Sequence, residues 1–297
     1  MCGPSMLKEG LSERMRGKVV VITGATSGIG QVAAENLAAM GARIVQVARD
    51  KARGEAALDR LRACGPNVQH TIHYADLSRL SEMKRVAAEI ARAEPHIDVL
   101  INNAGALFGS RQVTEDGLER TFALNHMSYF VVTHFLRERL KASAPARVIS
   151  TSSDAHRGNR LDFDDLQAAR NYRGFPVYGR SKLANILFTR ELARRLEGTG
   201  VTANALHPGF VATRFGDESR GLLSLGIRAA KLFAISPENG AKTIIYLASS
   251  PEVAGVTGRY FYKCRHSTPT REAQDDAAAK RLWAESVKLA GFKEAAV

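Results

Sequence analysis

Cysteine is scarce in this sequence. The 297 residues include only Cys2, Cys64 and Cys264, which are far apart. They show neither the close spacing of metal ligands nor the pairs of a disulfide framework. Their scarcity fits a reducing compartment, because disulfide-rich chains belong to oxidising ones. We therefore expect no metal site and a cytoplasmic protein.

Long apolar stretches are also missing. None reaches about 18 uninterrupted apolar residues, the length that a helix across a membrane needs. Residues 1–18 are polar and charged, unlike a signal peptide. No internal repeat or low-complexity linker divides the chain. These absences predict a soluble chain with no transmembrane segment and a single domain over residues 1–297.

Acidic residues are fewer than basic ones. The sequence has 42 Lys and Arg against 30 Asp and Glu, a net charge of +12. Such a balance attracts nucleic acid, an anionic membrane surface or an anionic small ligand. No arginine-rich run or nucleic-acid-binding motif accompanies the charge, so we expect no nucleic acid as partner. An anionic cofactor fits the charge, and a weak contact with a membrane surface stays open.

Apolar runs alternate with helical patterns along the chain. The runs predict strands at 18–23, 43–47, 68–74, 97–101, 147–151, 201–206 and 258–262. Helical patterns follow the first strand up to Gly41 and cover 115–140, 178–196, 237–247 and 271–289. Strands that are apolar throughout and alternate with helices are typical of a parallel sheet. We predict the α/β class, with a doubly wound, Rossmann-like parallel sheet.

The first strand runs into a glycine-rich turn. Gly24, Gly28 and Gly30 follow it with the spacing G-x-x-x-G-x-G, and a helical pattern begins there. The backbone N–H groups and the dipole of a helix N-terminus both favour an anion, so the turn is a candidate phosphate site. The spacing differs from that of the common dinucleotide-binding motif and from a P-loop. The alternative is a tight turn whose glycines serve packing alone.

The end of the second strand indicates the kind of cofactor. An acidic residue there holds the ribose hydroxyl group of NAD, whereas an arginine suits the 2′-phosphate of NADP. The chain has Arg49 followed by Asp50. Because the planar guanidinium of Arg49 suits a phosphate, we predict NADP(H) in preference to NAD(H). Asp50 leaves NAD open, and a solvated helix start is a further alternative.

Polar residues and glycines also stand at the ends of the later strands, where parallel sheets bind ligands. They are Asp76, Asn103, Ala104, Gly105, Ser153, Pro208 and Gly209. Asp76 is interpreted either as a helix cap or turn residue, or as a neighbour of the adenine. His207, which precedes Pro208, is interpreted as structural rather than catalytic.

Tyr178 and Lys182 are four residues apart. On a helix, this spacing places both side chains on one face. A free tyrosine has a pKa of about 10, too high for efficient proton exchange near neutral pH. A neighbouring cation lowers that pKa, so the pair is predicted to act as a general acid and base. Taken alone, the spacing is also common on helix surfaces.

Taken in order, these residues resemble the short-chain dehydrogenases/reductases over about residues 30–265. The matching stretches are Thr23-Gly24-x-x-x-Gly28-Ile29-Gly30, Asp76-Leu77, Asn102-Asn103-Ala104-Gly105, Asn125, Ser153, Tyr178-x-x-x-Lys182 and His207-Pro208-Gly209. The retinol dehydrogenase-like branch is the most similar. Its further matches are Arg49-Asp50, Asn125-His126, Ser152-Ser153-Asp154-Ala155-His156 and Ser181-Lys182-Leu183-Ala184-Asn185.

The resemblance implies roles for four catalytic residues. Tyr178 would exchange a proton with the substrate oxygen, and Ser153 would stabilise charge on that oxygen. Lys182 would lower the pKa of Tyr178 and hold the nicotinamide ribose, and Asn125 would position a water. The residues implied to bind the cofactor are Gly24, Ser27, Gly28, Ile29, Gly30, Arg49, Asp76, Leu77, Asn103, Ala104, Gly105, Tyr178, Lys182, Pro208, Gly209, Val211 and Thr213.

Residues 209–237 are predicted to form a substrate lid, and 271–297 a C-terminal helical extension. Apolar residues recur in the lid at helical spacing: Leu222, Leu225, Ala229, Leu232 and Phe233. An apolar lid excludes water and favours apolar substrates. A helix packed on the core and a helix on a membrane surface are the alternatives.

We therefore predict an NADP(H)-dependent oxidoreductase that acts on a small apolar carbonyl or alcohol substrate. The alternatives are an NAD-dependent alcohol dehydrogenase of the same family and a non-catalytic dinucleotide-binding regulator. Members of the family that the chain resembles often pair through the long helix and the tyrosine helix. A homo-oligomer, either a dimer or a tetramer, is accordingly expected.

Overall fold

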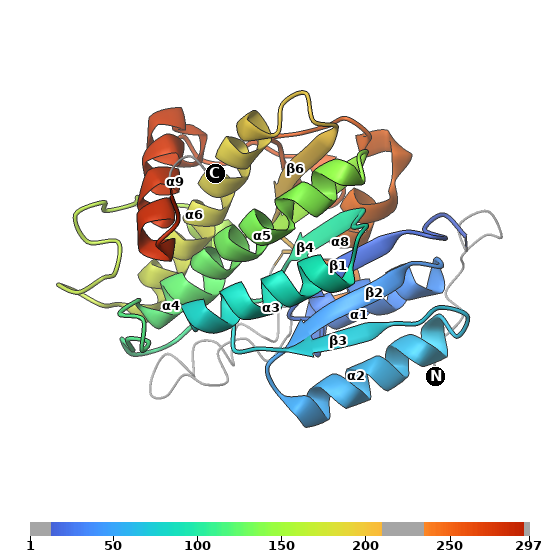
Figure 1. The fold of residues 1–297 in the computed structure, drawn as a ribbon. Coiled ribbons are helices and arrows are strands. Elements are labelled where there is room, and N and C mark those ends of the chain that lie inside the picture. The colour runs from blue at the N-terminus through green and yellow to red at the C-terminus, as the bar shows by residue number, and fades with distance from the viewer. Residues whose placement is uncertain (1–12, 210–234, 294–297) are drawn as a thin grey trace.

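The computed structural model describes residues 13–209 and 235–293 (Figure 1). Its strands are β1 (Val19–Thr23), β2 (Arg43–Ala48), β3 (Thr71–Tyr74), β4 (Val99–Asn102), β5 (Ala146–Thr151), β6 (Val201–Leu206), β7 (Tyr260–Tyr262) and β8 (Arg265–His266). Within this part of the chain they form one sheet in the order β3-β2-β1-β4-β5-β6-β7-β8. All neighbours are parallel except β7 and β8. The predicted doubly wound sheet is confirmed, and the antiparallel β8 is an addition to it.

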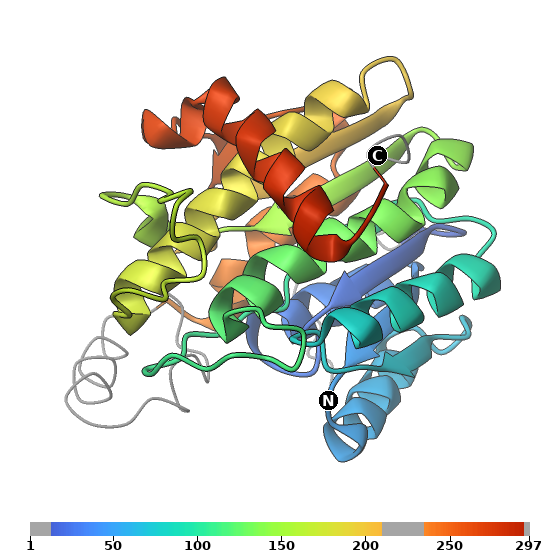
Figure 2. The ribbon, with the colours of Figure 1, turned by 60° about the vertical axis from the view of Figure 1, so that its left-hand side comes forward.

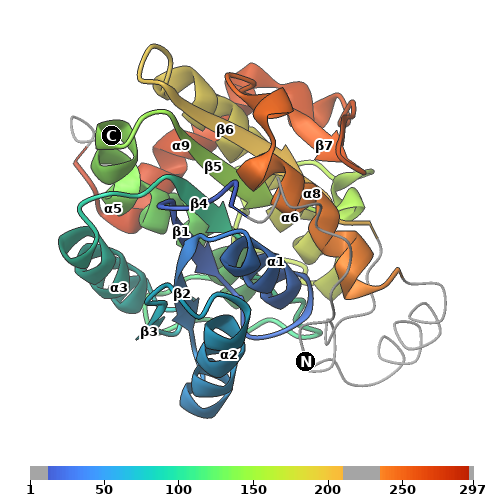
Figure 3. The same ribbon diagram turned by 90° about the vertical axis from the view of Figure 1, so that its right-hand side faces the viewer.

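Helices cover both faces of the sheet. They are α1 (Gly28–Ala39), α2 (Lys51–Cys64), α3 (Leu80–Ala93), α4 (Arg120–Phe122), α5 (Ser128–Ala142), α6 (Gly174–Arg195), α8 (Pro237–Ser249) and α9 (Asp276–Ala290). One layer contains α3, α5 and α6, in front of the sheet in Figure 1, and the other contains α1, α2 and α8, which Figure 3 shows. The central strands β1, β4, β5 and β6 are therefore largely buried, whereas the edge strands β3 and β8 are not.

The apolar runs of the strands serve two separate cores. In β1, Val21 packs into the core beneath α3, α5 and α6. Val20 and Ile22 pack into the core beneath α1 and α8. Successive side chains of a strand point to opposite faces, so a strand covered on both sides needs apolar residues at every position. This requirement explains why the strands appear in the sequence as unbroken apolar runs.

The long helix predicted for residues 115–140 differs from the structure in two ways. It begins at Arg120, because the Glu119 carboxylate accepts hydrogen bonds from the backbone N–H groups of Thr121 and Phe122 and caps the helix there. It is also interrupted by a π-helical turn at Ala123–Met127 before α5 continues. Such turns are frequent at functional sites, and this one contains Asn125.

The C-terminal helix begins later than predicted. The Asp275 carboxylate accepts a hydrogen bond from the N–H of Ala278, so α9 starts at Asp276 rather than at Arg271. Figure 2 shows α9 lying across the outer side of α6. There Trp283 stacks on Phe188 of α6, with ring centroids 5.9 Å apart, and meets Phe130 of α5 at 5.0 Å. The end of the chain thus covers the two helices that follow β4 and β5.

The apolar residues of the predicted lid lie outside the described residues, as do Val211 and Thr213. In the part of the chain that the structure describes, no helix has the length and apolar composition needed to cross a membrane.

Candidate active site

A cleft opens at the carboxyl ends of the strands, where the strand order reverses between β1 and β4. Ligands of doubly wound sheets bind at such a point. Its volume is about 690 Å³. The predicted residues that line it are Gly24, Ser27, Gly28, Ile29, Gly30, Arg49, Asp76, Leu77, Asn103, Ala104, Gly105, Ser153, Tyr178, Lys182, Pro208 and Gly209. The sequence prediction therefore converges on a single site.

The glycine-rich turn after β1 lies too close to the loop after β4 to carry side chains. A Cβ on Gly24 would lie 2.7 Å from the Cα of Ala104, and one on Gly30 would lie 2.4 Å from Asn103 Nδ2. Asn103 Nδ2 donates hydrogen bonds to the carbonyl groups of Thr23 and Gly24, at 3.2 and 3.0 Å. The two loops are thereby held against each other, and their backbones form the floor of the cleft.

The N-terminus of α1 faces the cleft. The Ser27 side chain at its N-cap accepts no hydrogen bond from the first turn of the helix. The N–H groups of that turn are therefore not occupied by a side-chain cap and can bind a phosphate. Arg53 from α2 donates to the hydroxyl groups of Thr26 and Ser27, both at 3.3 Å. This arrangement is suited to bind a dinucleotide. It consists of β1, the glycine-rich turn, the N-terminus of α1 and Arg53.

Arg53 is a cleft residue that the sequence analysis missed. Its signal was available, because Arg49 and Arg53 stand four residues apart around the start of α2. Asp50 was the reason that NAD remained an alternative cofactor. In the structure it is the N-cap of α2 and accepts a hydrogen bond from the N–H of Arg53 at 2.8 Å. It does not line the cleft, whereas Arg49 and Arg53 do.

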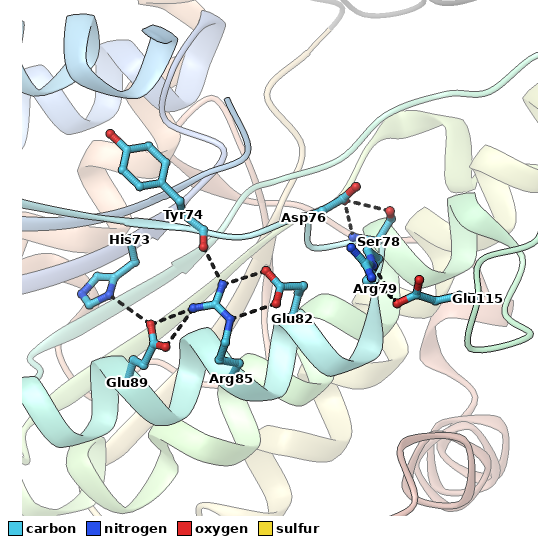
Figure 4. A network of polar contacts seen from close by, with 9 residues as sticks. All are labelled: His73, Tyr74, Asp76, Ser78, Arg79, Glu82, Arg85, Glu89 and Glu115. Atoms are coloured by element: carbon cyan, nitrogen blue, oxygen red, sulfur yellow. Dashed lines mark hydrogen bonds and ion pairs between the residues drawn. The ribbon is translucent and has the colours of Figure 1, made fainter. Parts of the chain in front are cut away.

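Asp76 is a turn residue rather than the cap of α3. Its carboxylate accepts hydrogen bonds from the N–H and the hydroxyl group of Ser78, at 2.9 and 2.8 Å (Figure 4). The first turn of α3 is capped by Asp116, which accepts from the N–H of Leu80 at 2.7 Å. Burial raises the pKa of Asp76, but the bonds from Ser78 and the charge of Arg49 outweigh it, and the net shift is downward. An ionised Asp76 is thus held at the cleft near Arg49.

Tyr178 and Lys182 lie on one face of α6, as predicted, and both line the cleft. Lys182 Nζ lies 5.6 Å from the centroid of the Tyr178 ring and donates a hydrogen bond to the carbonyl of Thr151 at 3.1 Å. Burial lowers the pKa of Lys182 to about 7. The pKa of Tyr178 is raised by burial, which outweighs a hydrogen bond with Ser153. The net shift of the Tyr178 pKa is therefore upward in the protein chain by itself, and its lowering by Lys182 stays a prediction.

Ser153 reaches Tyr178 because the turn after β5 docks on α6. The Ser153 hydroxyl group accepts a hydrogen bond from the N–H of Ala155 at 3.2 Å. Next to Tyr178, Gly179 permits a close approach, since a Cβ there would lie 2.5 Å from the carbonyl oxygen of Ala155. The hydroxyl group, the phenol and the ammonium thus meet in the cleft from two different elements.

Asn125 lies behind the cleft rather than in its wall. Its Oδ1 accepts from the N–H of Ala106, and its Nδ2 donates to the Ala106 carbonyl and to the hydroxyl group of Ser181, each at 2.9 Å. A Cβ on Gly105 would lie 3.2 Å from both Asn125 Oδ1 and Lys182 Nζ. Asn125 therefore fixes the loop after β4 beside Lys182. The water-positioning role stays a prediction.

One end of the cleft has apolar walls. Leu107, Phe108 and Phe175 line it, and Phe175 is 52% exposed. Phe175 stands three residues before Tyr178 on α6, a spacing that would have identified it from the sequence. His207 stacks on Tyr262 at 4.1 Å, and burial lowers its pKa to about 4. This arrangement agrees with the structural interpretation of His207.

Comparison with known proteins agrees with the geometry of the site. The family described as short chain dehydrogenase matches residues 18–221. Retinol dehydrogenase 14 from Homo sapiens is 42% identical in an alignment 298 positions long, gaps included, that covers 94% of this chain and 88% of that protein. Retinol dehydrogenase 12 from Mus musculus is 42% identical over 277 residues, covering 93% and 87%.

Solved structures show the same fold. A putative uncharacterized protein from Mycobacterium paratuberculosis has a TM-score of 0.76 at 31% identity, over 94% of this chain and 95% of that one. A putative NAD(P)-dependent gluconate 5-dehydrogenase from Beutenbergia cavernae, with bound NADP, has a TM-score of 0.67 at 26% identity, over 84% and 96%.

These matches, together with the sheet and the cleft, show that the chain belongs to the short-chain dehydrogenase/reductase family. Within the family it belongs to the retinol dehydrogenase-like branch. It is an NAD(P)-dependent oxidoreductase that acts on CH–OH or C=O groups.

Proposed function

We propose that the protein uses NADP(H) to interconvert an apolar carbonyl compound and its alcohol, with Asn125, Ser153, Tyr178 and Lys182 as its catalytic residues. The observation that carries the proposal is the meeting of Ser153, Tyr178 and Lys182 in the cleft that the glycine-rich turn opens. The three groups come from separate sequence motifs, and packing alone gives no reason for a buried ammonium beside a buried phenol.

The cofactor would lie along the strand ends. The first turn of α1 would hold its pyrophosphate, and Arg49 and Arg53 would hold the 2′-phosphate that distinguishes NADP from NAD. The use of Asp50 as a helix cap supports this choice, because that carboxylate is bound to the backbone of α2. Two solved relatives are described as containing NADP. Asp76 and Leu77 would border the adenine.

When bound, the nicotinamide cofactor supplies or accepts the hydride. The phenol of Tyr178 donates a proton to the substrate oxygen in reduction and removes it in oxidation. The Ser153 hydroxyl group hydrogen-bonds the same oxygen and stabilises the negative charge that develops there. Lys182 holds the nicotinamide ribose, and its charge offsets the effect of burial on the phenolate. Asn125 keeps the loop after β4 in place beside Lys182.

The substrate is proposed to be an apolar alcohol or aldehyde with an extended carbon skeleton. The ring of Phe175, which is 52% exposed, offers apolar surface in the cleft near Tyr178, whereas the lining residues Leu107 and Phe108 are buried. Burial of such surface against a substrate contributes about 25 cal/mol per Å². Relatives at 42% identity are named retinol dehydrogenases, and a retinoid belongs to this chemical class.

Replacement of Tyr178 by phenylalanine tests the proposal. We expect Tyr178→Phe to lose turnover of retinal and of smaller apolar aldehydes, measured by NADPH absorbance, because the proton donor is gone. NADPH binding, measured by fluorescence, should be unchanged. Tyr246→Phe is the matched control, since that hydroxyl group, on α8, bonds Glu252 in the short 3-10 helix that follows, away from the cleft. Turnover of Tyr178→Phe close to that of the control would refute the assignment.

A further inference from the structure

Two buried histidines lie directly behind the catalytic residues. His126 follows Asn125 in the π-helical turn, and His156 closes the short 3-10 turn that begins after Ser153. Both are 0% exposed, and neither lines the cleft. Each contacts residues 267–290, here called the C-terminal segment, which includes α9. The turns that carry two catalytic residues are therefore both connected to one distant part of the chain.

His156 connects the Ser153 turn to Thr270. Its Nδ1 lies 2.8 Å from the carbonyl oxygen of Ser153, and its Nε2 accepts a hydrogen bond from the N–H of Thr270 at 3.4 Å. Because Nε2 accepts, the proton of the neutral ring is on Nδ1, which donates to Ser153. The ring also packs edge-on against Tyr260, at 5.3 Å between centroids. The backbone of Ser153 is thus tied to the C-terminal segment.

His126 makes the corresponding connection for Asn125. Its Nε2 lies 2.8 Å from the hydroxyl group of Ser286 on α9. Its other ring nitrogen, Nδ1, is buried and makes no hydrogen bond with another described residue, although the Asn185 amide is near the ring. Asn185 Nδ2 donates to the Thr151 carbonyl at 3.3 Å, the same oxygen that accepts from Lys182. His126 therefore stands between α9 and the backbone group that anchors the catalytic lysine.

Both rings are held in the neutral form. Burial lowers the pKa of His126 to about 3. Burial also lowers the pKa of His156, and the opposing effects of the Ser153 carbonyl, Asp154 and Glu272 do not reverse the direction. A neutral imidazole has one donor and one acceptor. His156 thereby joins two partners, and His126 bonds Ser286, without bringing a charge near the phenol and the ammonium.

We propose that His126 and His156 are positioning residues, through which the C-terminal segment holds the turns of Asn125 and Ser153 in register with Tyr178. The proposal rests on the function proposed above for these catalytic residues. A displaced reacting group lowers the rate more than it lowers binding, because alignment matters most in the transition state. Loss of either connection should therefore reduce kcat and leave the affinity for NADPH unchanged.

Ser286→Ala removes the partner of His126 while keeping a good helix former. The matched control is Ser249→Ala on α8. Both hydroxyl groups bond the carbonyl four residues earlier, at 2.7 and 2.8 Å, but Ser249 contacts no histidine. We expect kcat of Ser286→Ala to fall about 3- to 10-fold, the scale of one hydrogen bond, with unchanged KM for NADPH. The control should keep wild-type kcat.

Two substitutions of His156 distinguish the effect of its N–H donor from the effect of its side-chain volume. Asparagine places an N–H group near the position of Nδ1, and leucine offers none. We expect His156→Asn to retain most of the wild-type kcat and His156→Leu to lose about 3- to 10-fold. Equal kcat values for the two variants, or a loss that follows their melting temperatures alone, would show a structural role and overturn the proposal.

Hydrogen exchange of the cofactor-free protein gives a readout that is independent of turnover. The N–H of Ala106 bonds Asn125, and the N–H of Ala155 bonds Ser153. Ala106 should exchange faster in Ser286→Ala, and Ala155 faster in His156→Leu, each relative to Ser249→Ala. Unchanged exchange overturns the proposal whatever the activity. If Tyr178→Phe keeps its turnover while these amides respond, the proposed function fails and the positioning connection stands.

Discussion

Replacing Lys182 with methionine tests the electrostatic account of the active site. The Lys182 side chain is 3% exposed, and burial lowers its pKa from 10.5 to about 7. At a pH between about 7 and 10.5, Lys182 therefore carries a proton in the unfolded chain but not in the folded chain. By linkage, the free energy of unfolding then rises with pH across this window. The penalty for burying the ammonium is complete below pH 7 and absent above pH 10.5.

The magnitude follows from the difference between the two pKa values. At about 1.4 kcal/mol per tenfold change, burial of the charge costs at most about 5 kcal/mol below pH 7. Methionine fills a similar volume but loses the hydrogen bond to Thr151, which contributes about 1 kcal/mol. We expect Lys182→Met to be more stable than wild type by up to about 4 kcal/mol at pH 6–7, and by less than about 1 kcal/mol at pH 9.5. It should have no turnover.

Guanidinium chloride unfolding at pH 6, 7, 8 and 9.5, followed through the fluorescence of Trp283, measures this difference. Lys288→Met is the matched control, because Lys288 is exposed on α9 and its removal should give no pH-dependent change relative to wild type. A stability difference for Lys182→Met that is the same at every pH would refute the reasoning, as would a variant less stable than wild type at pH 6.

Three further outcomes are expected. Arg53→Ala should weaken NADPH binding by about 1.5–3 kcal/mol and leave NADH nearly unchanged, with Arg62→Ala as control; equal losses for both cofactors in titration calorimetry would contradict the NADP assignment. Gly30→Ala should weaken both cofactors by about tenfold or more, since its Cβ would lie 2.4 Å from Asn103 Nδ2. Tight binding by this variant would show that the turn can move. Phe175→Ala should raise KM about 5- to 20-fold for retinal and little for acetaldehyde; a uniform change in steady-state assays would remove the ring from the substrate wall.

The strand ends could be predicted from the sequence because their constraints are local. The predicted bounds of β6 agree with the structure, where Gly200 precedes the apolar run and Pro208 follows closely after it. The glycine turn could be identified for the same reason. Gly24 and Gly30 leave no space for a Cβ, and the glycines are visible in the sequence itself. The predicted site residues beside these strand ends line one cleft in the structure.

Other features depend on partners that are distant in sequence. Nothing in the composition around Asn125 marks a π-helical turn, and its side chain finds Ala106 and Ser181 only in the fold. An aspartate at position 50 could cap a helix or bind a ribose, and the sequence does not distinguish the two roles. In the structure its carboxylate bonds the backbone of α2, as a helix cap does. The pKa of Tyr178 is likewise raised because the whole site buries the phenol. The four-residue spacing between Tyr178 and Lys182 in the sequence gives no information about that burial.

The covering of α5 and α6 by α9 has a consequence for the assembly of the protein. Phe130 and Phe188 meet Trp283 of α9, and His134 stacks on Phe292 at 4.0 Å. A chain shortened to end before α9 would expose these rings side by side, and an apolar surface of that kind favours self-association. In the structure, α9 and Phe292 cover these rings.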